Sequence, residues 1–432
     1  MAHEPVWQVI GQSVRGASHA RTGLPNQDAI HWFPESQQGP PLILVLSDGH
    51  GSTKSFRSEV GSRIAVEQTA RLLHEFLRGQ PRTANLTSVK RTAEERIPQE
   101  LVRRWQQSVD AHLKEMPFTD EELARLTEKR GGGSRSELSA NPRLAYGATV
   151  LAVLVTREYL LFLQLGDGDM LTVMENGEVL RPLERDSRLF ANETTSLCMD
   201  RAWREVRLRF QACYGPLPAL VLVATDGYAN SFINDSAFLK VGPDILDILK
   251  ADGLAAVQTN LPGWLEEAST AGSGDDITLG LLFRRDLLPS TVAATERAEG
   301  TREHSLADQA AGSVAEPAVA EASTTAAAAS SVVSEGGAQL EGSGEAERDA
   351  GLRSRLVARL KHEGPREPAK SGRLVDLVGE HEDNRPGHPS DGSEAEEHTT
   401  TGDATDTAGG ANARPSEGRH TDSAADRGTR EG

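Results

Sequence analysis

The chain contains few cysteines and no long apolar run. Cys198 and Cys213 are the only cysteines in 432 residues, which excludes a disulfide framework and favours a reducing compartment. The longest apolar stretch, residues 148–155, is far too short to cross a membrane. The N-terminus lacks the basic and apolar regions of a signal peptide. We therefore predict a cytoplasmic protein without a membrane span.

Aromatic residues are missing from the last third of the chain. The last of them is Phe283, and no Ile, Met or Cys follows it. A segment of this composition cannot bury enough apolar surface to offset the loss of chain entropy. The sequence thus predicts one folded domain over residues 1–285 and a disordered low-complexity tail over residues 286–432. Within the tail, residues 352–378 form a short helical island, for which a docking motif and a transient helix are both open.

A basic surface is also missing. The formal net charge is −18, whereas a general nucleic-acid-binding protein usually presents a basic face. We therefore predict no nucleic-acid partner, and we assign the acidity to solubility and to hydration of the tail.

The order of the predicted elements indicates an α+β domain. Short strands and turns rich in Gly, Pro and Asn fill the first fifty residues, which is typical of an antiparallel meander rather than a βαβ unit. Helical spacing of apolar residues predicts helices over residues 58–79 and 86–116, with a break at Pro98. The remaining predicted strands cover residues 148–155, 159–165, 171–174, 178–180, 205–211, 220–224 and 277–283, and two further helices cover 245–250 and 254–271.

Two apolar strands lead directly into an Asp-Gly pair. Asp48-Gly49 follows residues 42–46, and Asp226-Gly227 follows residues 220–224. An ionised carboxylate at the end of a core strand is costly to desolvate unless a cation or hydrogen bonds compensate it. A bound metal is the simplest compensation.

Several further aspartates lie beside glycine or at strand ends. Any one of them alone is better explained as a turn residue, but five such positions together favour a site for hard divalent cations, which prefer oxygen ligands. Gly49 has no side chain to keep a cation from its carbonyl oxygen. Zinc-type His/Cys patterns and a P-loop are both absent. The five positions are Asp28, Asp48, Asp167, Asp226 and Asp275.

These residues belong to short motifs that follow one another in a fixed order. Taken together, the motifs resemble the metal-dependent serine/threonine protein phosphatases of type 2C, the PPM family, in a bacterial-style version, over residues 8–284. They are Asn26-Gln27-Asp28-Ala29, Ser47-Asp48-Gly49-His50-Gly51, Gly147-Ala148-Thr149, Gly166-Asp167, Ala224-Thr225-Asp226-Gly227 and Gly274-Asp275-Asp276-Ile277-Thr278.

The resemblance implies a fold and a metal centre. The fold is an α-β-β-α sandwich of two antiparallel sheets flanked by helices, and the metals are two Mn²⁺ or Mg²⁺ ions with a third, weaker ion. Asp48 would bridge the two metals and the Gly49 carbonyl would ligate one of them. Asp226 and Asp275 would complete one metal shell. Asp28 would hold the bridging or a metal-bound water, and Asp167 would share the third ion with Asp226.

The resemblance also implies a reaction and its partners. The substrates would be phosphoserine and phosphothreonine proteins, opposed by a cognate kinase. Separately from the resemblance, a partner that docks on the tail island at residues 352–378 stays open. A hydroxide between two dications would attack the phosphate, and the leaving oxygen would need a proton. His50 matches the position of the general acid, with an ordinary turn histidine as the alternative.

Three positions depart from the family pattern. Family members often carry an arginine a few residues before the first aspartate to bind the substrate phosphate. The nearest candidates here are Arg21 and His19, either of which could be a plain surface residue. Asp276 stands where asparagine is common and could serve as an acceptor behind the metal ligands or as a strand cap. Gly-Asp-Gly-Asp at residues 166–169 replaces the more usual Gly-Asp-Ser-Arg of the family, so Asp169 has no predicted role.

Two other functions remain open at this stage. One is a haloacid-dehalogenase-like phosphohydrolase, with Asp167 and Asp169 as its nucleophile pair after an apolar strand. The other is a pseudophosphatase that binds phosphoproteins as a sensor or scaffold without turnover. The intact set of acidic residues argues against the second.

Overall fold

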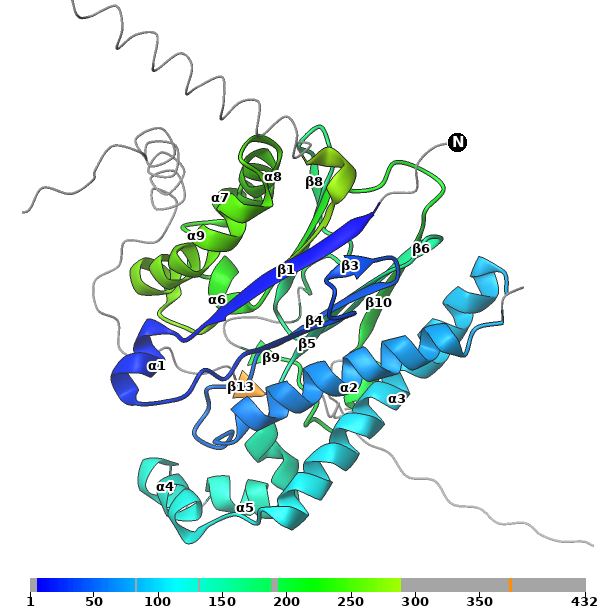
Figure 1. Cartoon of the computed structure of the whole chain (residues 1–432). Coiled ribbons are helices and arrows are strands. Elements are labelled where there is room, and N and C mark those ends of the chain that lie inside the picture. The colour runs from blue at the N-terminus through cyan, green and yellow to red at the C-terminus, as the bar shows by residue number, and fades with distance from the viewer. Residues whose placement is uncertain are drawn as a thin grey trace, which may run out of the picture. The chain divides into compact units, whose positions relative to one another are not determined.

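Two antiparallel sheets lie face to face, with helices on both outer sides (Figure 1). The structure is a computed structural model. It describes residues 6–288, except 82–83, 131–132, 187 and 189–192, and a short strand at Arg373–Leu374. The predicted sandwich and α+β class are confirmed. No helix among these residues is both long and apolar enough to cross a membrane.

The first sheet contains both chain ends of the described domain. Its order is β3-β1-β12-β11-β7-β8, and each neighbouring pair is antiparallel. The long central pairing joins β1 to β12, so the first and last strands of the domain lie side by side. The bounds are β1 Trp7–Val14, β3 Gln38–Gly39, β7 Asp169–Val173, β8 Val179–Leu180, β11 Leu220–Ala224 and β12 Ile277–Arg284.

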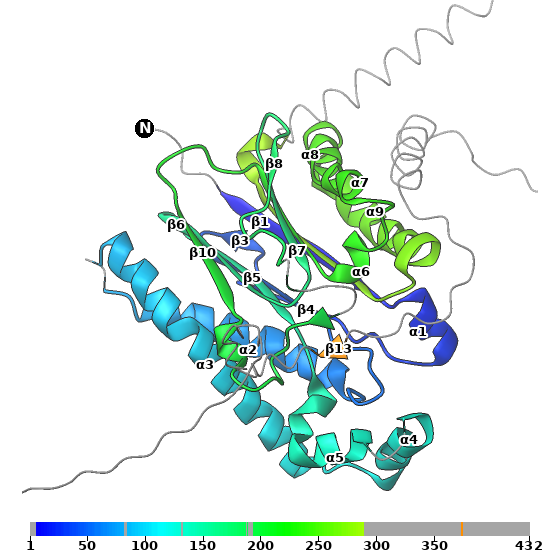
Figure 2. The same ribbon diagram turned by 180° about the vertical axis from the view of Figure 1, so that it is seen from behind.

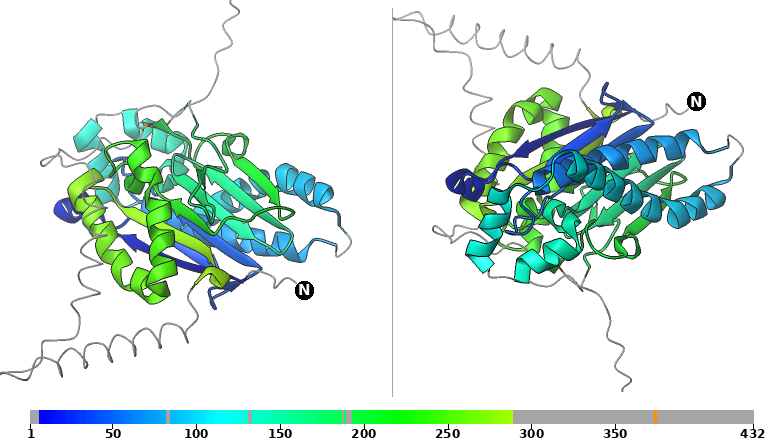
Figure 3. Two further views of the ribbon diagram at one scale, coloured as in Figure 1. Left: turned by 90° about the horizontal axis from the view of Figure 1, so that it is seen from above. Right: turned by 90° about the horizontal axis from the view of Figure 1, so that it is seen from below.

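The second sheet has the order β10-β6-β5-β4-β2, again antiparallel throughout. Its inner strands are apolar on both faces because one face meets the other sheet and the opposite face meets helices. Seen from behind and along the sheets, the two layers stack with their helices outside (Figures 2 and 3). The bounds are β2 Ala29–Phe33, β4 Leu42–Ser47, β5 Val150–Val155, β6 Tyr159–Leu165 and β10 Arg207–Ala212.

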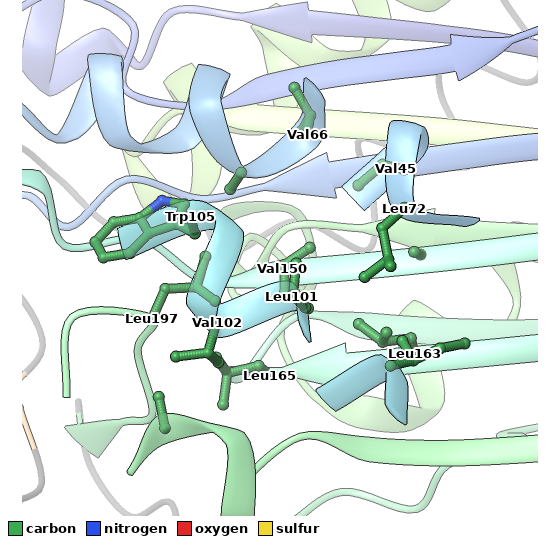
Figure 4. Packing of buried hydrophobic residues seen from close by; sticks show 14 of the residues in the cluster. Val45, Val66, Leu72, Leu101, Val102, Trp105, Val150, Leu163, Leu165 and Leu197 are labelled. Atoms are coloured by element: carbon green, nitrogen blue, oxygen red, sulfur yellow. The ribbon is translucent and has the colours of Figure 1, made fainter. Parts of the chain in front are cut away.

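Three hydrophobic clusters hold these layers together. One lies between the sheets and includes Trp7, Leu44 and Phe162. A second packs α2 and α3 on the second sheet, with Trp105 fully buried (Figure 4). A third packs α8 and α9 on the first sheet around Leu265. The helix bounds are α1 Ala17–Thr22, α2 Ser58–Arg78, α3 Leu86–Glu115, α4 Asp120–Arg130, α5 Gly133–Ala140, α6 Asp226–Ala229, α7 Asp235–Leu239, α8 Val241–Ala251 and α9 Gly253–Ala268.

Two local predictions are wrong. The predicted meander is divided between the sheets, because β1 pairs with β12 and β3 while β2 pairs with β4. Pro98 does not break the second long helix and lies buried inside α3. Burial of the apolar residues on either side of it, among them Ile97, Leu101 and Trp105, offsets the missing backbone hydrogen bond.

The predicted tail lies almost wholly outside the described residues. This applies to its predicted disorder and to most of the island at residues 352–378. The exception within the island is β13, Arg373–Leu374, which pairs in parallel with β9, Glu193–Thr194.

Candidate functional site

Each of the five aspartates lies next to a strand end. Asp48 follows β4, Asp226 follows β11 and opens α6, and Asp167 lies in the turn between β6 and β7. Asp28 precedes β2, and Asp275 lies two residues before β12. The two sheets therefore deliver carboxylates to the same edge of the sandwich.

Three of these side chains form a compact acidic group. One carboxylate oxygen from each of Asp48, Asp167 and Asp226 lies within 4.8 Å of the other two. The three residues come from three different strand ends, about 60 to 180 positions apart in the sequence. Such spacing suits several oxygen ligands on a divalent cation or a close pair of them.

Asp28 is fixed behind this group by two threonines. Its Oδ2 accepts hydrogen bonds from the hydroxyls of Thr225 and Thr278, each at 2.8 Å. Thr225 directly precedes Asp226, so the end of β11 both orients Asp28 and carries Asp226. The sequence prediction missed both threonines because a hydroxyl beside an apolar strand has no distinctive spacing.

Gly49 occupies a position with no room for a side chain. A Cβ there would lie 2.5 Å from the Gln27 carbonyl oxygen and 2.8 Å from that of Ser58. Glycine is therefore required for steric reasons. Its close approach to Gln27 brings the Asp48 turn next to the loop that carries Asp28.

Asp167 is held by β9 and the residue after it, where the sequence analysis predicted neither a strand nor a helix. The Thr194 hydroxyl donates a 2.9 Å hydrogen bond to Asp167 Oδ1. The preceding Gly166, at φ +110°, donates its N–H to Thr195 Oγ1 at 2.9 Å. β9 and its flank thus fix the orientation of this carboxylate.

The surroundings of the five aspartates disfavour the ionised form of their side chains. Desolvation raises the pKa of all five carboxyl groups, and the charges of neighbouring aspartates raise it further. The pKa of Asp226 rises to about 7, and those of Asp28 and Asp48 lie well above 3.8. A group of all-oxygen ligands with uncompensated charge fits divalent cations such as Mn²⁺ or Mg²⁺.

This charge balance predicts a pH dependence of stability in chelator-treated protein. The pKa of Asp226 is about 7 when folded and near its ordinary value when unfolded. The folded state thus binds more protons between about pH 4 and 7, and Asp226 makes the free energy of unfolding fall as pH rises through that window. We expect Asp226→Asn to gain stability over the unchanged chain across this range, measured by urea unfolding at pH 5, 6 and 7. A gain that shrinks with rising pH would contradict the assigned charge repulsion.

His50 comes two residues after Asp48 and lies within the protein. Its side chain is buried, and its Nε2 has no hydrogen-bond partner among the described residues. Its ring packs so closely that a Cβ on Gly147 would lie 2.4 Å from His50 Cδ2. Burial, helped by the charge of Lys54, lowers the pKa of His50 to about 4. The imidazole is therefore neutral at neutral pH before substrate binds.

The two candidate phosphate ligands have very different surroundings. Arg21 is exposed on α1. His19 is largely buried, with Nδ1 2.9 Å from Asp276 Oδ2 and Nε2 3.9 Å from Asp275 Oδ1. Burial lowers the pKa of His19, but the close carboxylates of Asp276 and Asp275 together outweigh it, so the pKa is raised above 6.5. His19 thus lies against two carboxylates.

The other two departures from the family pattern, Asp276 and Asp169, are both buried acceptors. Asp276 accepts hydrogen bonds from the backbone N–H groups of Gly16 and Gln27, each at 2.6 Å. Asp169 is 3% exposed and pairs with Arg181 and Arg185, each at 2.7 Å. These ion pairs compensate the charge of Asp169.

Comparisons with known proteins agree with this geometry. A sequence model of the family described as protein phosphatase 2C matches residues 15–266, more than half of the chain. No curated protein matches it in sequence.

Solved structures that match part of this chain include two serine/threonine phosphatases and one regulatory protein. The catalytic domain of the serine/threonine protein phosphatase PstP, in complex with two manganese ions, is 16% identical (64% of this chain, 98% of that chain, TM-score 0.39). The serine/threonine phosphatase Stp1 from Staphylococcus aureus is 14% identical (64% and 94%, TM-score 0.41). PppA of Pseudomonas aeruginosa, a regulatory component of T6SS, is 17% identical (64% and 97%, TM-score 0.40).

Proposed function

Because this chain belongs to the protein phosphatase 2C family and is a protein serine/threonine phosphatase, we propose that it hydrolyses phosphoserine and phosphothreonine in proteins with two bound Mn²⁺ or Mg²⁺ ions. The observation that carries the proposal is the approach of Asp48, Asp167 and Asp226 to within 4.8 Å from three separate strand ends. The crowding that raises their pKa values is relieved when cations bind there.

Each aspartate has a different role in the proposed metal site. Asp48, from one sheet, and Asp226, from the other, would hold the ions between them, with Asp275 and the Gly49 carbonyl completing the shells. Asp167 would hold a third, weaker ion, and Asp28 would orient a water. When bound, dications at these residues would lower the pKa of a water ligand to near neutrality and would neutralise the charge of phosphate oxygens.

His50 remains the proposed general acid. With a pKa of about 4 it carries the extra proton in only about one molecule in a thousand at pH 7. The negative charge of a bound phosphate raises the pKa of a nearby imidazole, so His50 would gain its proton in the substrate complex. The proton would then pass to the departing serine or threonine oxygen.

The loss of kcat on substitution of His50 should therefore depend on the leaving group of the substrate. We expect His50→Gln to lower kcat on a phosphothreonine peptide about 10²-fold, the usual contribution of general acid catalysis. On p-nitrophenyl phosphate the loss should be under about tenfold, since nitrophenolate leaves without a proton. Steady-state kinetics on both substrates would check this, with His31→Ala, on the exposed face of β2, as control. Equal losses on both substrates would contradict the acid role.

The function itself is tested by metal reconstitution of the full chain. Chelator-treated protein should be inactive on phosphothreonine peptides and regain activity with Mn²⁺ or Mg²⁺. Metal binding without turnover on a broad phosphopeptide panel would instead favour the pseudophosphatase.

The haloacid-dehalogenase interpretation is wrong. Family membership excludes it, and Asp169, its second aspartate, is buried in ion pairs with two arginines. Phosphoproteins are the expected substrates of this family. A cognate kinase, a partner for the tail and a cytoplasmic location remain proposals.

A further inference from the structure

The loop before β12 is fastened by a second segment from the beginning of the chain. Ser18 donates both its N–H, at 2.8 Å, and its hydroxyl, at 2.5 Å, to the Gly274 carbonyl oxygen. The Ala17 N–H donates to Ser269 Oγ at 3.0 Å, and that hydroxyl donates to the Asp275 carbonyl oxygen at 2.8 Å. The backbone of Asp275 is thus held from the side of α1.

The contact between these segments is too close for larger residues. A Cβ on Gly16 would lie 2.4 Å from the Asp275 carbonyl carbon and 2.6 Å from the Asp276 nitrogen. Gly274 adopts φ +77°, in the left-handed region that favours glycine. Both glycines allow the backbone of residues 16–19 to lie directly on residues 274–276.

Asp276 is the central acceptor of this contact. Its side chain is 3% exposed, and its two oxygens take the N–H groups of Gly16 and Gln27. His19 Nδ1 makes the third contact, at 2.9 Å. Gln27 neighbours Asp28, so this one carboxylate ties the loops of Asp28 and Asp275 to each other.

The ring of His19 fits between the two neighbouring carboxylates. Its Nδ1 lies 2.9 Å from Asp276 Oδ2 without the alignment of a hydrogen bond, and its Nε2 lies 3.9 Å from Asp275 Oδ1. The Asp275 side chain is 42% exposed, and its Oδ1 also accepts the Asp276 N–H at 2.9 Å, so the ring and this N–H face the same oxygen. A buried ring at this place limits the positions that the Asp275 carboxylate can take.

We propose that His19 is a positioning residue that, through its contact with Asp276, holds Asp275 in place to bind a divalent cation. This rests on the proposed function, in which Asp275 is a metal ligand. It also assigns His19 to the metal side of the site, in place of the substrate phosphate. Partners behind metal ligands typically change metal affinity 10- to 100-fold when they are removed.

The test measures manganese binding directly rather than activity. Free Mn²⁺ is quantified by electron paramagnetic resonance during titration of the chelator-treated full chain, which gives the number and affinity of sites. Asp275→Asn identifies the site to which Asp275 belongs. We expect His19→Ala to weaken that same site about tenfold or more and to leave the other within about twofold.

Two conservative variants separate positioning from a general loss of structure. The amide nitrogen of His19→Asn can lie near the Nδ1 position, beside Asp276 Oδ2, so this variant should recover affinity to within about threefold of the unchanged chain. His19→Gln places its amide nearer the Nε2 position and should recover less. The melting temperature of each variant and of the control His31→Ala would be recorded in parallel.

The possible results separate the inference from the function it rests on. Unchanged manganese affinity in His19→Ala, with a raised KM for phosphopeptide, would overturn the inference and favour the phosphate ligand. Equal losses in His19→Ala and His19→Asn would also overturn it. A failure of the unchanged chain to bind manganese would overturn the proposed function, and the inference with it.

Discussion

Replacement of Asp48 by asparagine should reduce kcat/KM on a phosphothreonine peptide by about 10³-fold or more, since metal-ion catalysis supplies several kcal/mol of transition-state stabilisation. Asp48 is one of three carboxylates whose oxygens lie within 4.8 Å of one another. An amide keeps the shape of the side chain but loses the negative charge and one acceptor oxygen. Steady-state kinetics at saturating Mn²⁺ would measure the loss.

The same variant should keep its fold, and without metal it should be at least as stable as the unchanged chain. The charges of Asp28 and Asp226 raise the pKa of Asp48, so removing its charge relieves repulsion in the metal-free protein. Asp200→Asn is the matched control, because it makes the same change on a side chain that is 84% exposed. Full activity in Asp48→Asn would contradict the metal centre, and unfolding of the variant would contradict the charge assignment.

Asp167→Asn should have a milder effect than Asp48→Asn. Asp167 would hold only the third, weaker ion, so its loss should be recovered in part at high Mn²⁺. Complete inactivity of Asp167→Asn at every metal concentration would contradict this division of roles.

Addition of Mn²⁺ to the chelator-treated chain should raise its melting temperature by roughly 5–10 °C for each site that is filled, at about 100 times the dissociation constant of that site. Binding to the folded state alone contributes about 2.7 kcal/mol per site under that condition, and a domain of this size gains about 2–4 °C for each kcal/mol. The physical reason is relief of repulsion among carboxyl groups whose pKa values are raised by desolvation and by one another.

Two controls make the thermal shift specific. Sodium chloride at equal ionic strength should give a much smaller shift, since general screening acts weakly on buried charges. Asp48→Asn should lose most of the shift. An equal shift in Asp48→Asn and the unchanged chain would place the stabilising metal elsewhere.

Much of the secondary structure follows from local patterns in the sequence. Leu42–Ser47 and Leu220–Ala224 are strands because continuous apolar runs this short suit a strand covered on both faces. Pro98 was misjudged because its helix is stabilised by long-range packing, which outweighs one lost hydrogen bond. The meander was misjudged because pairing of β1 with β12 joins residues more than 260 positions apart, which no local pattern encodes.

The candidate site, like the secondary structure, was predicted from the sequence only in part. The sequence by itself determined that aspartates stand at strand ends and follow the order of a phosphatase family, because residue types and short spacings are local properties. Only the tertiary structure decided which carboxylates meet, that His50 is buried and neutral, and that His19 contacts Asp275 and Asp276. Those facts depend on desolvation and on contacts between distant strands, which arise only when the two sheets pack together.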